Sequence, residues 1–202
     1  FTSGTTDAPK AVMLSQNNIC ANIESLSHYL KLYPTDTLLS FLPIHHTFEC
    51  TITFLFGLYW GTTVAFCDGL KYIQQNLKEY EISVFVAVPV VLETMYKKIK
   101  KALEQSIPLE AILGGHLRTI LYGAAPMDKD TIIGYKNLGI NSTQGYGLTE
   151  TSPVISAEAD DRKRPGSVGL VLDNLEVKIE EPNQEGIGEI VVKGPSIMLR
   201  LL

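Results

Sequence analysis

Short apolar runs alternate with amphipathic helical patterns through the first two thirds of this chain, and this alternation constrains the fold more than any other feature. Ser83–Val88 is an almost continuous β-branched run, typical of a strand that is covered on both faces. Pro89 then opens a long helical pattern that continues to about Leu103. Strands and helices that alternate in this way form a mostly parallel sheet with helices on its faces. The sequence therefore predicts an α/β fold, with a layered, mostly parallel sheet flanked by helices.

The remaining elements follow from periodicity. Apolar runs predict further strands at Thr37–Leu42, Thr63–Phe66, Leu117–Tyr122 and Ile140–Thr143. Helical spacing predicts helices at Gln16–Lys31, Phe48–Tyr59, Leu70–Tyr80 and, with Asp128 as N-cap, up to Leu138. After Pro165 the pattern changes to two short alternating strands, Leu175–Glu180 and Glu189–Lys193, joined by the turn-rich Pro182–Gly186. We expect an α/β part over residues 1–164 and the start of a small antiparallel β unit over residues 165–202.

The composition excludes several classes of protein. With 45% hydrophobic and 19% charged residues among 202, the chain can bury a core, and disorder is not expected. The formal net charge is −5 and no long basic block occurs, so neither nucleic acid nor an anionic membrane surface is an expected partner. Cys20, Cys50 and Cys67 lack a CxxC spacing, and we interpret them as buried thiols in a reducing cytoplasm.

One stretch requires a test against a membrane span. The 18 residues from Cys50 to Cys67 carry no charge, which is near the lower length limit of a transmembrane helix. Gly57 and Gly61 interrupt the stretch, however, and Val64–Phe66 has the character of a strand. We expect a buried helix followed by a buried strand and no membrane span, which leaves peripheral contact with a membrane open.

The start of the chain has the composition of a phosphate-binding loop. Residues 2–10 contain four hydroxyls, a glycine and a lysine, in the run Thr2-Ser3-Gly4-Thr5-Thr6-Asp7-Ala8-Pro9-Lys10. Backbone N–H groups, hydroxyl donors and one cation together suit a polyphosphate. It is not a Walker loop, because Pro9 precedes the lysine and no Ser or Thr follows it. Taken alone, the run could equally be an ordinary turn rich in Ser and Thr.

Four phrases in order resemble the adenylate-forming superfamily, which includes acyl-CoA synthetases, firefly luciferase and peptide-synthetase adenylation domains. The loop is similar to the family signature T-S-G-T-T-G-x-P-K-G at Thr2 to Thr6, Pro9 and Lys10. The later phrases are Leu42–Glu49, with its histidine pair; Gly123-Ala124-Ala125-Pro126-Met127; and Gln144-Gly145-Tyr146-Gly147-Leu148-Thr149-Glu150. Residues 164–169 and 188–195 also fit, so the resemblance covers the whole chain and implies the acyl-CoA synthetase-like fold.

The resemblance implies a reaction in which a carboxylate attacks the α-phosphorus of ATP, pyrophosphate leaves, and CoA then takes the acyl group while AMP is released. Because the attacking carboxylate is already ionised, the site needs positive charge, hydrogen-bond donors and alignment rather than a general base. By resemblance, Thr5, Thr6 and Lys10 hold the β- and γ-phosphates, with Thr2, Ser3 and Gly4 in the same loop.

The resemblance also assigns the remaining site residues. It implies that Thr149 binds the α-phosphate, that Glu150 ligates magnesium, and that His46 borders the acyl pocket. Adenine would stack on Tyr146, with the wall beside it formed by Gly123, Ala124, Ala125 and Pro126. The other residues that would bind the nucleotide are Gln144, Gly145 and Gly147. Plain alternatives remain for some of these residues. Tyr146 could be a loop aromatic, Glu150 could complement a helix dipole, and the pair His45-His46 could bind a metal.

The sequence departs from the family pattern at three places. Asp7 stands where the family has glycine, and a carboxylate about 4 Å from a phosphate costs about 4 kcal/mol at an effective dielectric of 20. Ala11 replaces a second glycine, and the segment between Lys101 and Gly114 is shorter than in long-chain synthetases. Asp7 keeps open a second hypothesis, that of a non-catalytic, nucleotide-binding relative.

The acyl substrate and the chain ends complete the prediction. Phe48-Glu49 after the histidines resembles long-chain fatty acyl synthetases, so a fatty acid is expected, with an amino-acid adenylation domain as the alternative because of Glu49. The chain starts at Phe1 without a methionine and stops within an apolar phrase at Leu202. We therefore expect a cytoplasmic protein that continues at both ends and whose C-terminal lid domain is absent from this fragment, which should be inactive alone.

Overall fold

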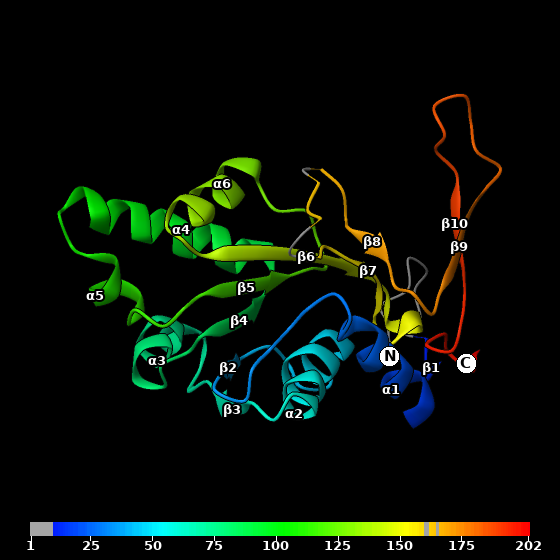
Figure 1. Cartoon of the computed structure of the whole chain (residues 1–202), viewed down its shortest axis with the longest axis horizontal. Coiled ribbons are helices and arrows are strands. Elements are labelled where there is room, and N and C mark those ends of the chain that lie inside the picture. The colour runs from blue at the N-terminus through cyan, green and yellow to red at the C-terminus, as the bar shows by residue number, and fades with distance from the viewer. Residues whose placement is uncertain (1–9, 160–161, 165) are drawn as a thin grey trace. The chain divides into compact units, whose positions relative to one another are not determined.

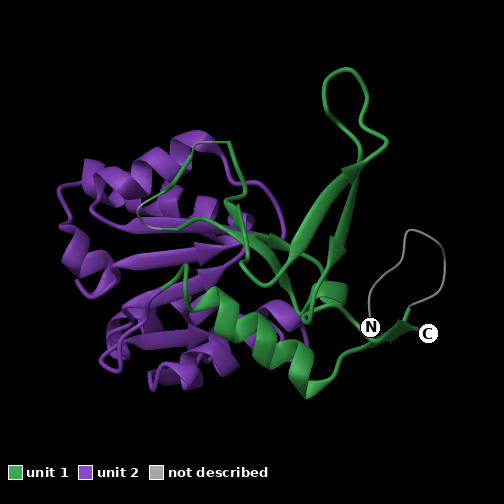
Figure 2. Ribbon diagram, turned by 45° about the vertical axis from the view of Figure 1, so that its right-hand side comes forward, with its two compact units in different colours: residues 1–30, 146–202 green, residues 31–145 purple. Residues whose placement is uncertain are grey.

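A computed structural model describes residues 10–159, 162–164 and 166–202, and the chain divides into two compact units. Unit 1 comprises residues 1–30 and 146–202, and unit 2 comprises residues 31–145 (Figure 2). The predicted boundary near residue 165 does not coincide with this division, and it remains a prediction about domains.

Unit 2 is built on parallel strands, as the alternation predicts. The strands lie in the order β3 (Thr63–Phe66), β2 (Thr37–Ser40), β4 (Val84–Ala87), β5 (Thr119–Tyr122) and β6 (Asn141–Gly147), whose last two residues belong to unit 1 (Figure 1). All four neighbouring pairs are parallel. Every residue of β4 is buried, which confirms that this run forms an interior strand. The carboxyl ends of these strands therefore meet at one edge of the sheet.

Helices follow the strands of unit 2. They are the π-helix η1 (Phe48–Leu55) continued by α2 (Phe56–Tyr59), the 3₁₀ turn η2 (Leu70–Tyr72) before α3 (Ile73–Glu79), and then α4 (Pro89–Glu104), α5 (Leu109–Leu113) and α6 (Lys129–Asn137). In α6 the carboxylate of Asp128 accepts a hydrogen bond from the Thr131 N–H at 3.0 Å, as expected of an N-cap. The predicted single helix over 48–59 is wrong in one respect, because its first eight residues are wound as a π-helix.

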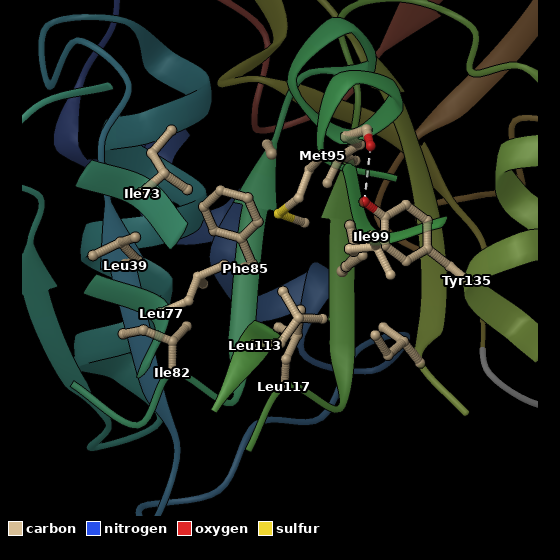
Figure 3. Packing of buried hydrophobic residues seen from close by; sticks show 14 of the residues in the cluster. Leu39, Ile73, Leu77, Ile82, Phe85, Met95, Ile99, Leu113, Leu117 and Tyr135 are labelled. Atoms are coloured by element: carbon tan, nitrogen blue, oxygen red, sulfur yellow. Dashed lines mark hydrogen bonds between the residues drawn. The ribbon is translucent and has the colours of Figure 1, made fainter. Parts of the chain in front are cut away.

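The core of unit 2 lies between its sheet and helices. Leu92, Met95 and Ile99 occupy one face of α4 and are buried against residues from β4, β5 and α6. Figure 3 shows Met95 and Ile99 beside Phe85 and Tyr135. The hydroxyl of Tyr135 donates to the Leu92 carbonyl at 2.8 Å, so this buried polar group is satisfied. Full burial of one such aliphatic side chain contributes about 1.5–3 kcal/mol, and the cluster therefore fixes the sheet that carries the loops of interest.

Unit 1 contains α1 (Gln16–Leu26) and short antiparallel pairs. They are β1 (Val12–Met13) with β11 (Arg200–Leu201), β7 (Val154–Ala157) with β8 (Leu170–Val171), and β9 (Glu176–Glu180) with β10 (Glu189–Lys193). The β9–β10 hairpin confirms the predicted antiparallel unit at the C-terminal end. Helix α1 is shorter than predicted because residues 27–29 form a tighter turn after Leu26, in which His28 N–H donates to Ser25.

Two expectations about apolar residues are also settled. Cys20 is exposed and Cys50 and Cys67 are half-buried free thiols, so the prediction that all three are buried was wrong. The uncharged stretch from Cys50 forms η1, α2 and β3, as a helix followed by a strand. The prediction that the strand is buried was wrong, because Thr63 and Phe66 at the two ends of β3 are exposed. Within the described residues, no helix combines the length and the apolar character that crossing a membrane requires.

Candidate active site

In unit 2, the loop after β5 packs directly on the end of β6. A Cβ built on Gly123 would lie 3.0 Å from the backbone oxygen of Gly145 and 3.5 Å from the ring of Phe48. The parallel pairing of Tyr122 with Gln144 brings the two segments to the same edge of the sheet. A side chain at 123 would press on the backbone at 145, so glycine permits a flat wall here. The structure thus brings together parts of three predicted phrases, namely Phe48 of residues 42–49, Gly123 of residues 123–127 and Gly145 of residues 144–150.

The rest of this loop faces solvent but is anchored at its end. Ala124, Ala125 and Pro126 are exposed, whereas Met127 is buried in the core. Ala124 has φ +68°, in the left-handed region that an alanine enters at a cost of roughly 1–2 kcal/mol. The loop therefore holds a strained residue beside Gly123.

His46 lies in the loop between β2 and η1, at the same edge of the sheet. Its backbone N–H donates to the Pro43 carbonyl at 2.8 Å, and its ring Nδ1 accepts the N–H of Phe48 at 3.2 Å. An Nδ1 that accepts a hydrogen bond leaves the proton of the neutral ring on Nε2. The His46 ring is exposed, and its hydrogen bond with the start of η1 orients it.

Glu49 is a residue whose placement the sequence did not reveal. It is fully buried in η1, and Thr53 donates to its Oε2 at 2.9 Å. Burial raises the pKa of the Glu49 carboxyl, although hydrogen bonds from Ser40, Thr53 and the Phe41 backbone oppose this. Its Oε1 has no hydrogen bond of normal geometry to any described residue. The carboxyl packs towards the sheet, so it does not offer an exposed anion for an amino group.

In unit 1, the predicted pair Thr149-Glu150 occupies a closed turn between β6 and β7. The N–H of Leu148 reaches both the Pro153 carbonyl at 2.9 Å and the Thr151 hydroxyl at 3.0 Å. A Cβ built on Gly147 would be 1.7 Å from the Pro153 oxygen, so only glycine allows the turn to close. The Glu150 carbonyl accepts the Met198 N–H at 2.8 Å.

The two side chains of this turn are suited to an anion and a hard cation. Thr149 and Glu150 are half-buried, and neither side chain has a hydrogen-bond or ion-pair partner in the part of the chain that the structure describes. Their backbone carbonyls are nonetheless hydrogen-bonded, that of Thr149 to the Ser152 N–H and that of Glu150 to the Met198 N–H. No group of three His, Cys, Asp or Glu side chains that could hold a metal occurs among the described residues. One carboxylate fits magnesium, which is commonly bound through one or two carboxylates together with substrate phosphates and water.

The predicted phosphate loop at the start of the chain is only partly described by the structure. Residues 2–9, with Thr2, Ser3, Gly4, Thr5, Thr6 and Asp7, lie outside the described residues, and the phosphate loop remains a prediction. Lys10, which is described, is exposed.

The interpretation of Tyr146 as a loop aromatic is wrong, because Gln144 to Gly147 continue β6. The strand extends beyond the predicted Thr143, since pairing in the sheet overrides the weak strand propensity of its glycines.

A parallel sheet with glycine-lined loops at its carboxyl edge, followed along the chain by this hydroxyl–carboxylate turn, is the arrangement of an acyl-CoA synthetase-like fold. The comparisons identify the group: the AMP-binding enzyme family matches residues 1–202, and the chain belongs to that family. It is 30% identical over 245 residues to long-chain-fatty-acid–CoA ligase 6 of Mus musculus, covering 98% of this chain and 35% of the ligase. It is 31% identical over 219 residues to 4-coumarate-CoA ligase 2 of Narcissus pseudonarcissus, covering 98% and 37%.

A solved structure resembles the chain over nearly its full length. It is the o-succinylbenzoate coenzyme A synthetase of Bacillus subtilis in complex with ATP and a magnesium ion, with TM-score 0.79 and 25% identity. The match covers 99% of this chain and 41% of the synthetase. The chain spans about a third of the length of the curated relatives that it matches.

Proposed function

We propose that the protein containing this chain activates a carboxylic acid with ATP, forming an acyl-adenylate and then acyl-CoA with release of pyrophosphate and AMP. The observation that carries the proposal is the closed turn that presents Thr149 and Glu150 side by side without partners among the described residues. A hydroxyl donor and a carboxylate of this kind suit a phosphate with its magnesium ion. Membership of the AMP-binding enzyme family and the likeness to a synthetase solved with ATP and magnesium support the same conclusion.

The chemistry asked of the chain is positioning and charge stabilisation. Thr149 donates its hydroxyl hydrogen to the α-phosphate, and the carboxylate of Glu150 provides a hard oxygen ligand. Magnesium, when bound, neutralises phosphate charge so that an anionic carboxylate can approach. Tyr146 provides an aromatic face for adenine. The His46 ring, with its proton on Nε2, borders the path of the acyl group. No residue need remove a proton, because the attacking acid is ionised at neutral pH.

We further propose a fatty acid as the substrate and the cytoplasm as the location. Long-chain-fatty-acid–CoA ligases and a 4-coumarate-CoA ligase are both among the relatives, so acid activation has broader support than any one acid. The phrase Phe48-Glu49 after the histidines favours the long-chain type. The burial of Glu49 argues against its use as the anchor for an amino group.

The test is acid-dependent exchange between ATP and labelled pyrophosphate by the full-length protein, with palmitate, decanoate, 4-coumarate and a mixture of amino acids. We expect palmitate to stimulate exchange most and added CoA to yield palmitoyl-CoA and AMP. Fastest exchange with amino acids would replace the fatty acid proposal with the amino-acid alternative. ATP binding without exchange for any acid would contradict the activity and favour a non-catalytic relative.

A further inference from the structure

Asn22 is a fully buried amide on α1 that the proposed chemistry does not use. Its Nδ2 donates to the Val154 carbonyl at 2.7 Å and to the Thr151 carbonyl at 3.3 Å, and its Oδ1 accepts the Val154 N–H at 3.2 Å. One side chain thereby satisfies three backbone groups of the segment that follows the Thr149-Glu150 pair. A fully buried amide must have its polar atoms paired, and here all of the printed partners of Asn22 are backbone groups of this one segment.

The second buried asparagine of α1 binds a separate segment, after β10, that contacts the same turn. Asn18, one helical turn before Asn22, donates through Nδ2 to the carbonyls of Pro195 and Ile197 at 2.6 and 2.9 Å. The next residue along, Met198, donates its N–H to the Glu150 carbonyl. Positions i and i+4 lie on one face of a helix. This face of α1 is therefore a polar clamp, made of Asn18 and Asn22, that holds the backbone after the pair and the segment at residues 195–197.

A direct link joins the two segments that the clamp holds. The hydroxyl of Ser152, which is fully buried and has φ +69°, donates to the Ser196 carbonyl at 2.8 Å. Residues 151–154 and 195–198 are thus bonded to each other as well as to the clamp. The side chains of Thr149 and Glu150 are left without partners within the described part of the chain. The hydrogen bonds fix the backbone of the turn and leave these two groups for a ligand.

We propose that Asn22 is a positioning residue for the adenylation reaction, acting through the backbone of Thr151–Val154 on the orientation of Glu150. This inference rests on the proposed function, because it presumes that Glu150 meets the magnesium–phosphate group. An amide has few rotatable bonds, so it holds the turn at small entropic cost. Groups that orient a metal-binding carboxylate in this way typically alter affinity or activity by about 10- to 100-fold when removed.

The test compares Asn22→Ser with Asn17→Ser in the full-length protein. Asn17 lies on the same helix but is exposed, so its variant controls for the loss of one asparagine from α1. We expect Asn22→Ser to lower kcat for ATP–pyrophosphate exchange with palmitate roughly 10- to 100-fold and to raise the magnesium concentration at half-maximal rate. The KM for palmitate should stay unchanged, and Asn17→Ser should behave as wild type. Rates are corrected for the folded fraction measured by circular dichroism.

A second variant keeps the proposal testable if the serine variant does not fold. Asn22→Asp has the same shape, but an ionised carboxylate would face the Thr151 and Val154 carbonyls. Its protonated form can donate again to Val154, so its rate relative to wild type should recover as the pH is lowered. A rate ratio independent of pH in a folded Asn22→Asp protein would overturn the positioning role.

A double-mutant cycle separates this inference from the proposed function. In a Glu150→Gln background, Asn22→Ser should change the exchange rate less than about twofold, because the orientation of a lost carboxylate no longer matters. The same fold-loss in both backgrounds would overturn the positioning role while leaving the role of Glu150 intact. Normal exchange and magnesium dependence of Glu150→Gln alone would overturn the proposed site and this inference together.

Discussion

Gly147 and Pro153 approach so closely that a Cβ on the glycine would lie 1.7 Å from the proline carbonyl oxygen. The same oxygen accepts the Leu148 N–H, which closes the turn around Thr149 and Glu150. The contact is with backbone at both ends, so a flexible side chain cannot relieve it. The geometry of the candidate phosphate site therefore depends on the absence of a side chain at position 147.

We predict that Gly147→Ala destabilises the protein by about 3 kcal/mol and abolishes pyrophosphate exchange, because the turn must open to admit the methyl group. Gly139→Ala is the matched control. Gly139 has φ +75° but open space around its Cα, so alanine there should cost only the strain of roughly 1 kcal/mol and spare exchange. Urea unfolding measures the free energy of unfolding of both variants. Equal losses for the two variants would contradict the steric account.

Ala124 provides the opposite prediction, a gain in stability. Because its φ of +68° suits glycine, Ala124→Gly should stabilise the protein by about 1 kcal/mol. Ala125 lies in the same exposed loop and does not have a positive φ, so Ala125→Gly should be neutral or destabilising. Thermal unfolding of the two variants at one pH tests this. Stabilisation by both, or by neither, would show that strain at 124 is not the cause.

Glu49 should make stability depend on pH. The unfolded carboxyl ionises near its ordinary pKa, whereas burial raises the pKa in the folded protein, so the stability present at low pH is lost as the pH rises. A glutamine side chain cannot ionise. The free energy of unfolding of Glu49→Gln should therefore increase relative to that of wild type as the pH is raised from 4 to 8. Glu104→Gln, at an exposed position, is the control. A difference between Glu49→Gln and wild type that does not vary with pH would refute the raised pKa.

Glu150 should govern the magnesium requirement without supporting the fold. Its side chain has no partner among the described residues, so Glu150→Ala should leave the melting temperature within about 1–2 °C of wild type. The magnesium concentration at half-maximal exchange should rise by about tenfold or more. Unaltered magnesium dependence in a folded variant would remove Glu150 from the metal site.

The sequence predicted what periodicity and capping determine locally. The β4–α4 unit, the Asp128 cap and the β9–β10 hairpin all follow from short-range patterns, and all are found. The strand at 144–147 did not follow, because its glycines and polar residues enter β6 only through pairing in the sheet. The π-helix at Phe48 also has no local signature, since the apolar spacing of a single helix describes the segment equally well.

In the candidate site, too, the sequence predicted some features and missed others. Motif order named Gly123, Thr149 and Glu150, but it could not reveal why the glycines are needed, which depends on contacts with Gly145 and Pro153. Asn22 was missed although a signal existed: Asn18 and Asn22 are an i, i+4 pair of polar residues beside the apolar positions Ile19 and Ile23. Recognising its role required its backbone partners, which lie 129 and 132 residues away along the chain.

The most direct test of the central claim follows the oxygen atoms of the acid. The full-length protein is given palmitate labelled with ¹⁸O in its carboxylate, together with ATP, magnesium and CoA, and the products are analysed by mass spectrometry. If the carboxylate attacks the α-phosphorus, the P–O bond to pyrophosphate breaks, and thiolysis of the adenylate leaves one labelled oxygen in AMP. We predict one ¹⁸O per AMP formed and none in pyrophosphate. Unlabelled AMP, or ADP with labelled phosphate, would contradict activation through an acyl-adenylate.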